Sequence, residues 1–312
     1  MRIFYDQSCL EYFSPGHPER SERIARTAPL LKNRHPDWEW RKPAPATDAQ
    51  LLRVHSREHI NRVVKSRDDF DADTPFYPNI EAHARRSAGA AIDATRSTLQ
   101  GKTAFSLTRP PGHHATRDRA MGFCYFSNVA VAALDALTLA GIADAGLSMS
   151  SAFADATADQ APLPTAKVER IAIWDFDGHH GNGTEAIMVN NERNRFASIH
   201  QFPAYPGTGA KSFANIDNYP IAPYTPRELI LDIARRSLDK LSDFEPDLLL
   251  VSAGFDAYAR DPLLQLTLER EDLATFGKWL REIDVPVAVM LEGGYSNDLP
   301  ELIDAFLTAW AG

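Results

Sequence analysis

Cysteine is scarce in this chain of 312 residues, which contains only Cys9 and Cys124. Two thiols so far apart form neither a C-x-x-C metal or redox motif nor a disulfide framework. Apolar residues make up 44% of the chain, which is enough to fill a large core without covalent cross-links. The sequence therefore predicts a protein of a reducing compartment, and the cytoplasm is the simplest such setting.

Long apolar runs are also missing. A helix that crosses a bilayer needs roughly 20 consecutive apolar residues, and no stretch of the sequence comes near that length. Residues 1–6 have the composition of a short strand and lack the apolar region of a signal peptide. We therefore expect no membrane partner.

The chain has no excess of basic residues, because 33 Lys and Arg face 42 Asp and Glu for a net charge of −9. A surface that binds nucleic acid needs clustered Lys and Arg, so we expect no nucleic-acid partner. A negative field of this size mildly favours cationic substrates through long-range steering.

Several catalytic signatures are absent as well. The sequence contains no G-x-S-x-G elbow, no P-loop and no G-x-G-x-x-G after its first expected strand. These absences argue against serine hydrolases, P-loop nucleotide hydrolases and dinucleotide-dependent enzymes.

Short, nearly continuous apolar runs do recur along the chain. They occupy residues 104–107, 171–174, 197–200, 248–251 and 287–290. Strands that are buried on both faces have this pattern, which indicates a parallel sheet covered by helices. Helical segments alternate with the runs, at residues 79–99, 128–139, 268–280 and 298–310. We therefore expect one doubly wound α/β domain over residues 1–312.

Residues 141–166 stand apart because they are rich in Ala, Ser and Asp. They join an expected helix to the expected strand at 171–174, so they should lie at the amino edge of the sheet, away from the usual ligand site. We interpret them as an irregular insertion and not as an active-site lid.

Chemically useful side chains gather after the expected strands, where open α/β sheets bind their ligands. These loops hold residues 109–114, 175–183, 254–256 and 292–295, together with His200. This concentration of histidine and carboxylate predicts a catalytic centre at the carboxyl edge of the sheet.

The segment Asp175-Phe176-Asp177-Gly178-His179-His180 is the best candidate for a metal site. Residues two apart on an extended segment share a face, so a carboxylate and an imidazole can meet one ion, at about 2.0–2.2 Å for zinc. A third ligand must come from another loop, and Asp256 is the best candidate. Three protein ligands with one open position are typical of catalytic zinc. The alternative is a plain helix-capping turn with a solvated face.

His113 and His114 follow Pro-Pro-Gly and suit proton transfer better than joint chelation, because one backbone directs neighbouring side chains apart. Each imidazole needs a partner that sets its tautomer. Asp175 could serve one ring and Asn182 the other, which would give the two rings different pKa values. The alternative is a structural loop whose histidines bind backbone groups.

Tyr295 follows Gly293 and Gly294 and could donate a hydrogen bond to a developing oxyanion. A Gly-Gly-Tyr sequence can equally be an ordinary turn.

Taken together, these loops resemble the zinc-dependent histone deacetylase superfamily, including bacterial deacetylase-like amidohydrolases and acetylpolyamine amidohydrolases. The similarity runs from about Met1 to the C-terminus, with several motifs in the same order. The matching stretches are residues 109–115, 122–128, 175–184, 205–209, 252–262 and 291–295.

The resemblance implies an arginase-deacetylase fold with a central parallel sheet of eight strands and helices on both faces. It implies one zinc ion per chain, held by Asp177, His179 and Asp256. His114 would be the general base, and His113 would work as a pair with Asp175. Asn182 would orient His114, and Tyr295 would polarise the amide carbonyl.

The resemblance also implies a substrate channel and a structural potassium ion. The channel residues would be Gly122, Phe123, Tyr205, Leu263, Asp73 at the rim and Arg20 beneath the site. The potassium ligands would be Asp175, Ser198 and Ile199 with the backbones of Asp177 and His179.

The implied activity is hydrolysis of acyl-lysine in a peptide or protein, or of a small acylated amine, and an oligomer is compatible with it. Relatives selective for polyamines use an acidic gate, whereas this chain has Leu263 in the corresponding stretch. Asn182 stands where one branch has aspartate, and its Gly-Asn-Gly context resembles the class II branch. An acetylpolyamine amidohydrolase, a binuclear manganese ureohydrolase and a non-catalytic acyl-lysine binder remain open alternatives.

Overall fold

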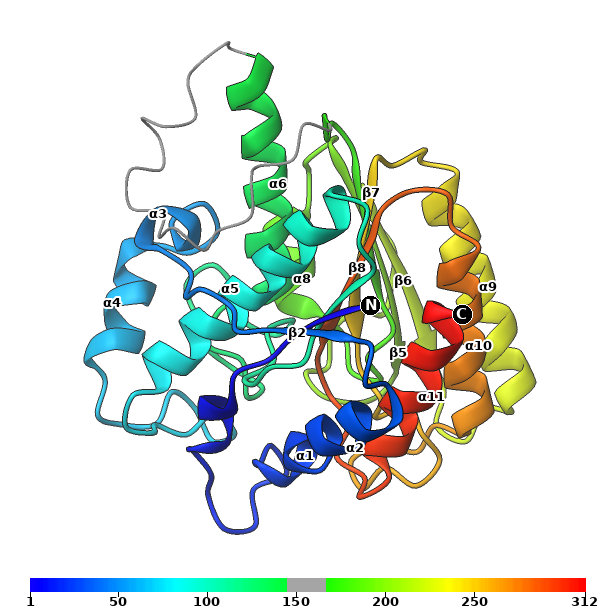
Figure 1. Cartoon of the computed structure of the whole chain (residues 1–312), viewed down its shortest axis with the longest axis horizontal. Helices are drawn as coiled ribbons and strands as arrows, with labels where there is room; N and C mark the ends of the chain where they lie inside the picture. Colours follow the sequence, from blue (N-terminus) through cyan, green and yellow to red (C-terminus); the bar gives the residue numbers. More distant parts are fainter. Residues whose placement is uncertain (145–166) are drawn as a thin grey trace.

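The computed structural model describes residues 1–144 and 167–312. In this part of the chain, eight parallel strands form a single sheet with the order β2-β1-β3-β8-β7-β4-β5-β6 (Figure 1). The strands are β1 (Arg2–Phe4), β2 (Glu39–Arg41), β3 (Ala104–Ser106), β4 (Ile171–Asp175), β5 (Asn194–Gln201), β6 (Ile216–Ile221), β7 (Leu248–Ala253) and β8 (Val287–Leu291). The expected parallel eight-stranded sheet is confirmed.

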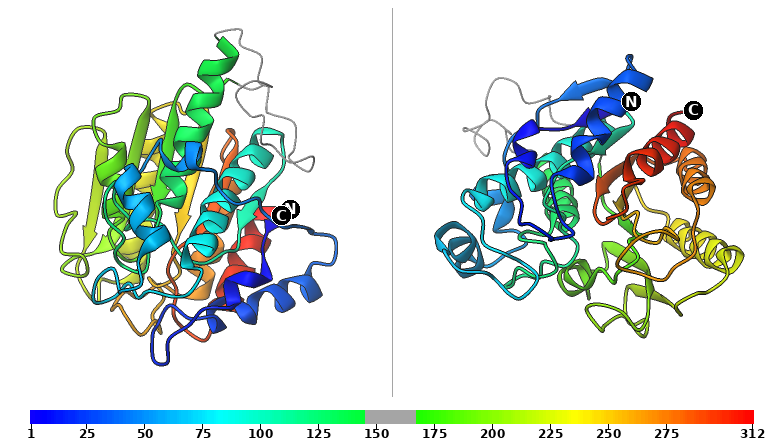
Figure 2. Two further views of the ribbon diagram at one scale, coloured as in Figure 1. Left: turned by 90° about the vertical axis from the view of Figure 1, so that its left-hand side faces the viewer. Right: turned by 90° about the horizontal axis from the view of Figure 1, so that it is seen from below.

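Helices cover both faces of the sheet (Figures 1 and 2). One face carries α5 (Ile80–Leu99) and α6 (Asn128–Asp144), and the other carries α9 (Arg227–Ser242), α10 (Arg270–Arg281) and α11 (Leu299–Ala311). The shorter helices are η1 (Gln7–Leu10), α1 (Glu22–Ala25), α2 (Thr27–Arg34), α3 (Asp48–Leu51), α4 (Arg57–Lys65) and α8 (Asn182–Met188). No helix in residues 1–144 and 167–312 has both the length and the apolar character that a membrane span requires.

The apolar runs bury side chains on both faces because successive residues of a strand point to opposite sides. In β7, Leu248 and Leu250 join the core cluster beneath α5 and α6. Leu249 and Val251 join the other cluster, beneath α9, α10 and α11. Continuous apolar runs were therefore a correct indicator of the central strands.

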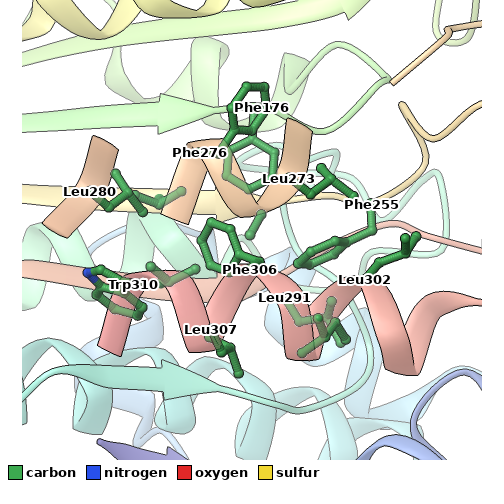
Figure 3. Close-up of a cluster of buried hydrophobic side chains, with 14 of the residues drawn as sticks. Phe176, Phe255, Leu273, Phe276, Leu280, Leu291, Leu302, Phe306, Leu307 and Trp310 are labelled. Carbon is green, nitrogen blue, oxygen red and sulfur yellow. The ribbon is translucent and has the colours of Figure 1, made fainter. Parts of the chain in front are cut away.

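Aromatic rings fill the space between the sheet, α10 and α11 (Figure 3). The Phe276 ring on α10 lies 5.2 Å from that of Phe176, and the Phe306 ring on α11 lies 5.8 Å from that of Phe255, measured between ring centroids. Phe176 stands between Asp175 and Asp177, and Phe255 directly precedes Asp256. The same loops therefore insert a ring into the core and hold a carboxylate at the carboxyl edge of the sheet.

Two edge strands and several short helices were not predicted from the sequence. β2 is only partly buried, and β6 contains a proline and polar residues, so neither has a continuous apolar run. The expected irregular segment at 141–166 was placed too early, because α6 continues helically to Asp144. The remainder of that segment, residues 145–166, lies outside the described residues.

Replacing Phe276 with alanine should lower the free energy of unfolding by about 3–5 kcal/mol, because it leaves a cavity among packed rings. Urea denaturation measures this change. The control is Leu229→Ala on α9, whose side chain is 49% exposed and which should change stability by about 0.5 kcal/mol or less. Equal small losses in both variants would show that the ring cluster does not support the fold.

Candidate active site

The loops with chemically useful side chains follow five neighbouring strands, β3, β8, β7, β4 and β5. Carboxyl ends of parallel strands meet at one edge, so residues far apart in sequence come together there. This edge faces the viewer in the right-hand view of Figure 2, with α1 and α2 packed beside α11.

Asp177, His179 and Asp256 form a buried group whose potential ligand atoms all lie within 4.8 Å of one another. His179 Nδ1 is 2.7 Å from Asp256 Oδ2 and 3.3 Å from Asp177 Oδ1. Burial alone would lower the pKa of His179, but the two carboxylates outweigh it and raise the pKa to about 10. Without a metal, a proton on His179 compensates the carboxylates, and a divalent cation at the same centre would replace that proton.

Backbone groups complete the surroundings of the two carboxylates. The N–H of Gly293 donates to Asp177 Oδ2 at 2.7 Å, and that of Gly178 donates to Asp256 Oδ1 at 2.6 Å. A Cβ atom at position 293 would lie 2.5 Å from Asp177 Oδ2 and 2.6 Å from Asp256 Oδ2. Glycine is therefore required at 293 for steric reasons. The two carboxylates and one imidazole fit a catalytic zinc site by donor chemistry.

The two neighbouring histidines have different partners. His113 Nδ1 donates to Asp175 Oδ2 at 3.1 Å, whereas His114 Nδ1 donates to Asn182 Oδ1 at 2.8 Å. Burial opposes a charge on His113, but Asp177 and Asp175 outweigh it and raise its pKa to about 10. Burial, with the His113 and His179 rings nearby, lowers the pKa of His114 well below its usual value. The site thus pairs a cationic ring with a neutral ring whose Nε2 is free to accept a proton.

The loop that carries these histidines is anchored by Glu292, which follows β8. Glu292 Oε2 accepts hydrogen bonds from the N–H groups of Gly112 at 2.6 Å and His113 at 3.2 Å, and Oε1 accepts one from Ser252 Oγ at 3.2 Å. Burial raises the pKa of Glu292 to about 7.

Tyr295 is held from both its backbone and its ring. Its N–H donates to Asp261 Oδ2 at 2.7 Å, and the Arg23 guanidinium lies 4.8 Å from the centre of its ring. Burial raises the pKa of the phenol well above its usual value, so Tyr295 remains a hydrogen-bond donor at any physiological pH.

A buried network of ion pairs beneath Tyr295 was not predicted from the sequence. Glu19 accepts hydrogen bonds from Arg109 Nη2 at 2.7 Å and Arg23 Nη1 at 3.1 Å, with a further short contact from Arg109 Nε. Arg23 Nε in turn donates to the Gly294 carbonyl at 2.8 Å. The network therefore connects the N-terminal segment to the turn that carries Tyr295.

The expectation for Arg20 needs correction, because Arg23 and not Arg20 lies beneath the site. Arg20 is partly exposed and donates to Asn297 Oδ1 at 3.2 Å. The two arginines are three residues apart, close to one helical turn. A regular apolar spacing would have revealed which of them is buried, but charged residues surround both.

The other expected channel residues line a cavity of about 300 Å³ that also contains His114, His179 and Tyr295. The rings of Phe123 and Tyr205 face its interior, 5.8 Å from Tyr295 and 5.0 Å from His114 respectively, measured between centroids. The cavity is lined by the expected residues Asp73, Gly122, Phe123, Tyr205 and Leu263, together with His17 and Pro18. Gly122 has φ +56°, and a Cβ atom there would lie 2.5 Å from His114 Cδ2, so a larger residue would displace His114.

The expected potassium ligands lie where β4 and β5 pair. Asp175 is the partner of Ser198 in the register of the two strands, and Ile199 follows it. Burial lowers the pKa of His200 to about 3, so this neutral ring donates through Nε2 to the Gly209 carbonyl and accepts from Ser198 Oγ at 2.9 Å. The structure thus brings the expected potassium ligands to the strand pair behind the metal site.

Removing the carboxylate of the buried network, as in Glu19→Gln, should lower the free energy of unfolding by about 3–5 kcal/mol, because two buried guanidiniums lose their compensating charge. The control is Arg34→Gln, which removes two ion pairs of a half-exposed arginine, with Glu301 and Asp304, and should cost about 1 kcal/mol or less. Chemical denaturation compares the two. A cost for Glu19→Gln no greater than that for Arg34→Gln would contradict the assigned role of the network.

A family model described as the histone deacetylase domain matches residues 17–143 and 154–310 of the chain. The break between the two matched ranges falls within the segment 141–166.

Relatives of at least 30% identity cover most of this chain. An uncharacterized protein of Synechocystis sp. is 39% identical over 316 residues, which cover 96% of this chain and 95% of that protein. The histone deacetylase-like amidohydrolase of Pseudomonas aeruginosa is 33% identical over 305 residues, with 90% and 73% covered. Acetylpolyamine amidohydrolase 1 of the same species is 32% identical over 239 residues, with 73% and 61% covered.

Among solved structures, the crystal structure of the HDA15 HD domain superimposes with a TM-score of 0.84 at 28% identity. The superposition covers 100% of this chain and 91% of that domain.

Proposed function

The chain belongs to the histone deacetylase family, and from this premise we propose that it is a zinc-dependent amidohydrolase that removes acyl groups from lysine-type amines. One observation carries the proposal: His179, which belongs to the group formed with Asp177 and Asp256, lines the same cavity as His114 and Tyr295. A protein that only binds acyl-lysine would have no need of a general base beside a metal site.

Zinc held by Asp177, His179 and Asp256 would act as a Lewis acid on the amide carbonyl and would lower the pKa of a bound water to about 7. His114 is suited to take the proton from the attacking water, because its Nδ1–H is engaged by Asn182 and its Nε2 carries the free lone pair. Burial holds the pKa of His114 below its usual value, so the ring is in its neutral form at neutral pH and its Nε2 is unprotonated.

Two further side chains would act on the reacting amide. The Tyr295 hydroxyl would donate a hydrogen bond to the carbonyl oxygen, and this bond strengthens as the oxygen gains negative charge. His113, held cationic by Asp175 and Asp177, would stabilise the same developing charge and could supply a proton to the leaving amine.

The cavity walls would determine which amine is accepted. Phe123 and Tyr205 would enclose the methylene stem of the substrate and exclude water from the reacting bond. Potassium, coordinated by Asp175, Ser198, Ile199 and the backbones of Asp177 and His179, would stabilise the strand pair that carries the zinc ligands.

Two alternatives are less well supported. Leu263 lines the cavity, and an apolar side chain cannot act as the acidic gate expected of polyamine-selective relatives. A binuclear ureohydrolase needs a second set of ligands, and within residues 1–144 and 167–312 the group Asp177, His179 and Asp256 is the one cluster with the geometry for a metal.

Replacing His114 with alanine, or Tyr295 with phenylalanine, should each lower kcat for an acetyl-lysine substrate by about 100-fold or more, because each removes a group that acts in the transition state. Both variants should retain one zinc ion per chain, as measured by elemental analysis beside the kinetics.

Tyr224→Phe is the matched control, since that tyrosine is 75% exposed and lies outside the cavity; its activity should equal that of the wild type. Full activity in both active-site variants would rule out the proposed mechanism.

A further inference from the structure

Two charged side chains of opposite sign lie near the catalytic site: Asp73 lines the catalytic cavity, and Arg20 lines a second cavity that adjoins it. Neither forms an ion pair with any other residue in the described ranges, and they do not pair with each other. Two other arginines near the site already form ion pairs. Arg23 pairs with Glu19, and Arg260 lies 3.4 Å from both Glu269 and Asp298. Arg20 and Asp73 are therefore the charges available to a substrate.

Arg20 lines a second cavity of about 660 Å³ that adjoins the catalytic one. The two cavities share four lining residues, His17, Pro18, Leu263 and Tyr295. A ligand that leaves the catalytic cavity past these residues therefore comes directly to the Arg20 side. The planar guanidinium, held by a single hydrogen bond to Asn297, can still present paired N–H groups to a carboxylate.

Asp73 lines the catalytic cavity and contacts His17, which lines both cavities. The Asp73 carbonyl oxygen is 3.3 Å from His17 Nε2, and its N–H donates to Asp71 Oδ1 at 3.0 Å. These backbone contacts hold the loop, while the exposed carboxylate lines the catalytic cavity. Asp73 thus lines the catalytic cavity and Arg20 lines the adjoining one, and His17 belongs to both linings.

These two charges are complementary to the two charges on the α-carbon of a free amino acid. When the acyl amide lies beside His114 and Tyr295 and the stem lies between Phe123 and Tyr205, the α-carbon emerges at the mouth. A lysine within a peptide carries neither an ammonium nor a carboxylate at that atom, whereas free lysine carries both.

We propose that the mouth selects free Nε-acyl-lysine as substrate, with Asp73 binding its α-ammonium and Arg20 its α-carboxylate. This inference rests on the proposed function, because it assigns a substrate class to the same site. A diamine would engage Asp73 alone and a peptide would engage neither charge in this way.

Four substrates separate the two contacts in the zinc-loaded full chain. Nε-Acetyl-lysine has both charges, 6-acetamidohexanoate lacks the ammonium, N-acetyl-1,5-diaminopentane lacks the carboxylate, and Nα-acetyl-Nε-acetyl-lysine amide lacks both. Since a hydrogen bond to a charged group contributes about tenfold or more in binding, kcat/KM should be highest for Nε-acetyl-lysine. It should fall by about tenfold or more for each substrate that lacks one charge.

Two variants test which residue binds each charge of the substrate. Arg20→Gln should lower kcat/KM for the two substrates with a carboxylate and leave that for N-acetyl-1,5-diaminopentane unchanged. Asp73→Asn should lower it for the two substrates with an ammonium and leave that for 6-acetamidohexanoate unchanged. Arg26→Gln and Asp68→Asn are matched controls, because these exposed residues lie in the same segments but line neither cavity.

The possible failures are distinguishable. If the doubly blocked acetyl-lysine or the diamine is hydrolysed as well as Nε-acetyl-lysine, or if Arg20→Gln has no greater effect than Arg26→Gln, the selectivity is wrong and the deacylase function stands. If zinc-loaded protein hydrolyses none of the four substrates, the proposed function fails and the inference fails with it.

Discussion

Three carboxylates, those of Asp175, Asp177 and Asp256, are buried together at one edge of the sheet. Buried negative charge is costly unless neighbouring groups compensate it. His113 lies between Asp175 and Asp177, and His179 lies between Asp177 and Asp256. The resulting chain of alternating charges keeps both rings cationic without a metal and makes the centre between Asp177 and Asp256 attractive to a divalent cation.

The aromatic core behind the sheet holds this charge arrangement in place. Phe176 and Phe255 each directly precede a proposed metal ligand in the sequence. Their rings pack against Phe276 and Phe306 (Figure 3). A shift of either loop would therefore disturb the ring cluster. Tyr295 is held in a comparable way by Asp261 and Arg23, so the groups that would act on the substrate rest on buried supports.

The parts of the fold that could be predicted are those marked by a regular pattern of residues along the sequence. The runs at 104–107, 171–174 and 248–251 predicted central strands because a doubly covered parallel sheet buries every residue of such a strand. Once those strands were placed, the rule that ligands bind at their carboxyl ends led to Asp177, His179 and Asp256. The partners of His113 and His114 followed from the need of each imidazole for a defined tautomer.

Features that depend on contacts between distant parts of the chain were harder to predict from the sequence. The edge strands β2 and β6 bury only part of their side chains and so lack an apolar run. Glu19 is buried by its pairing with Arg109 across about 90 residues of sequence, which no local pattern indicates. Arg20 was placed beneath the site where Arg23 lies, because charged residues surround both arginines in the sequence.

In the proposed mechanism, one metal ion held by Asp177, His179 and Asp256 enables amide hydrolysis in this cavity. Titrating metal-free protein with zinc while measuring hydrolysis of Nε-acetyl-lysine tests it most directly. We expect activity to rise in proportion to added zinc and to reach its maximum at one ion per chain. Activity in the metal-free protein, or a maximum that requires a second ion, would contradict the claim.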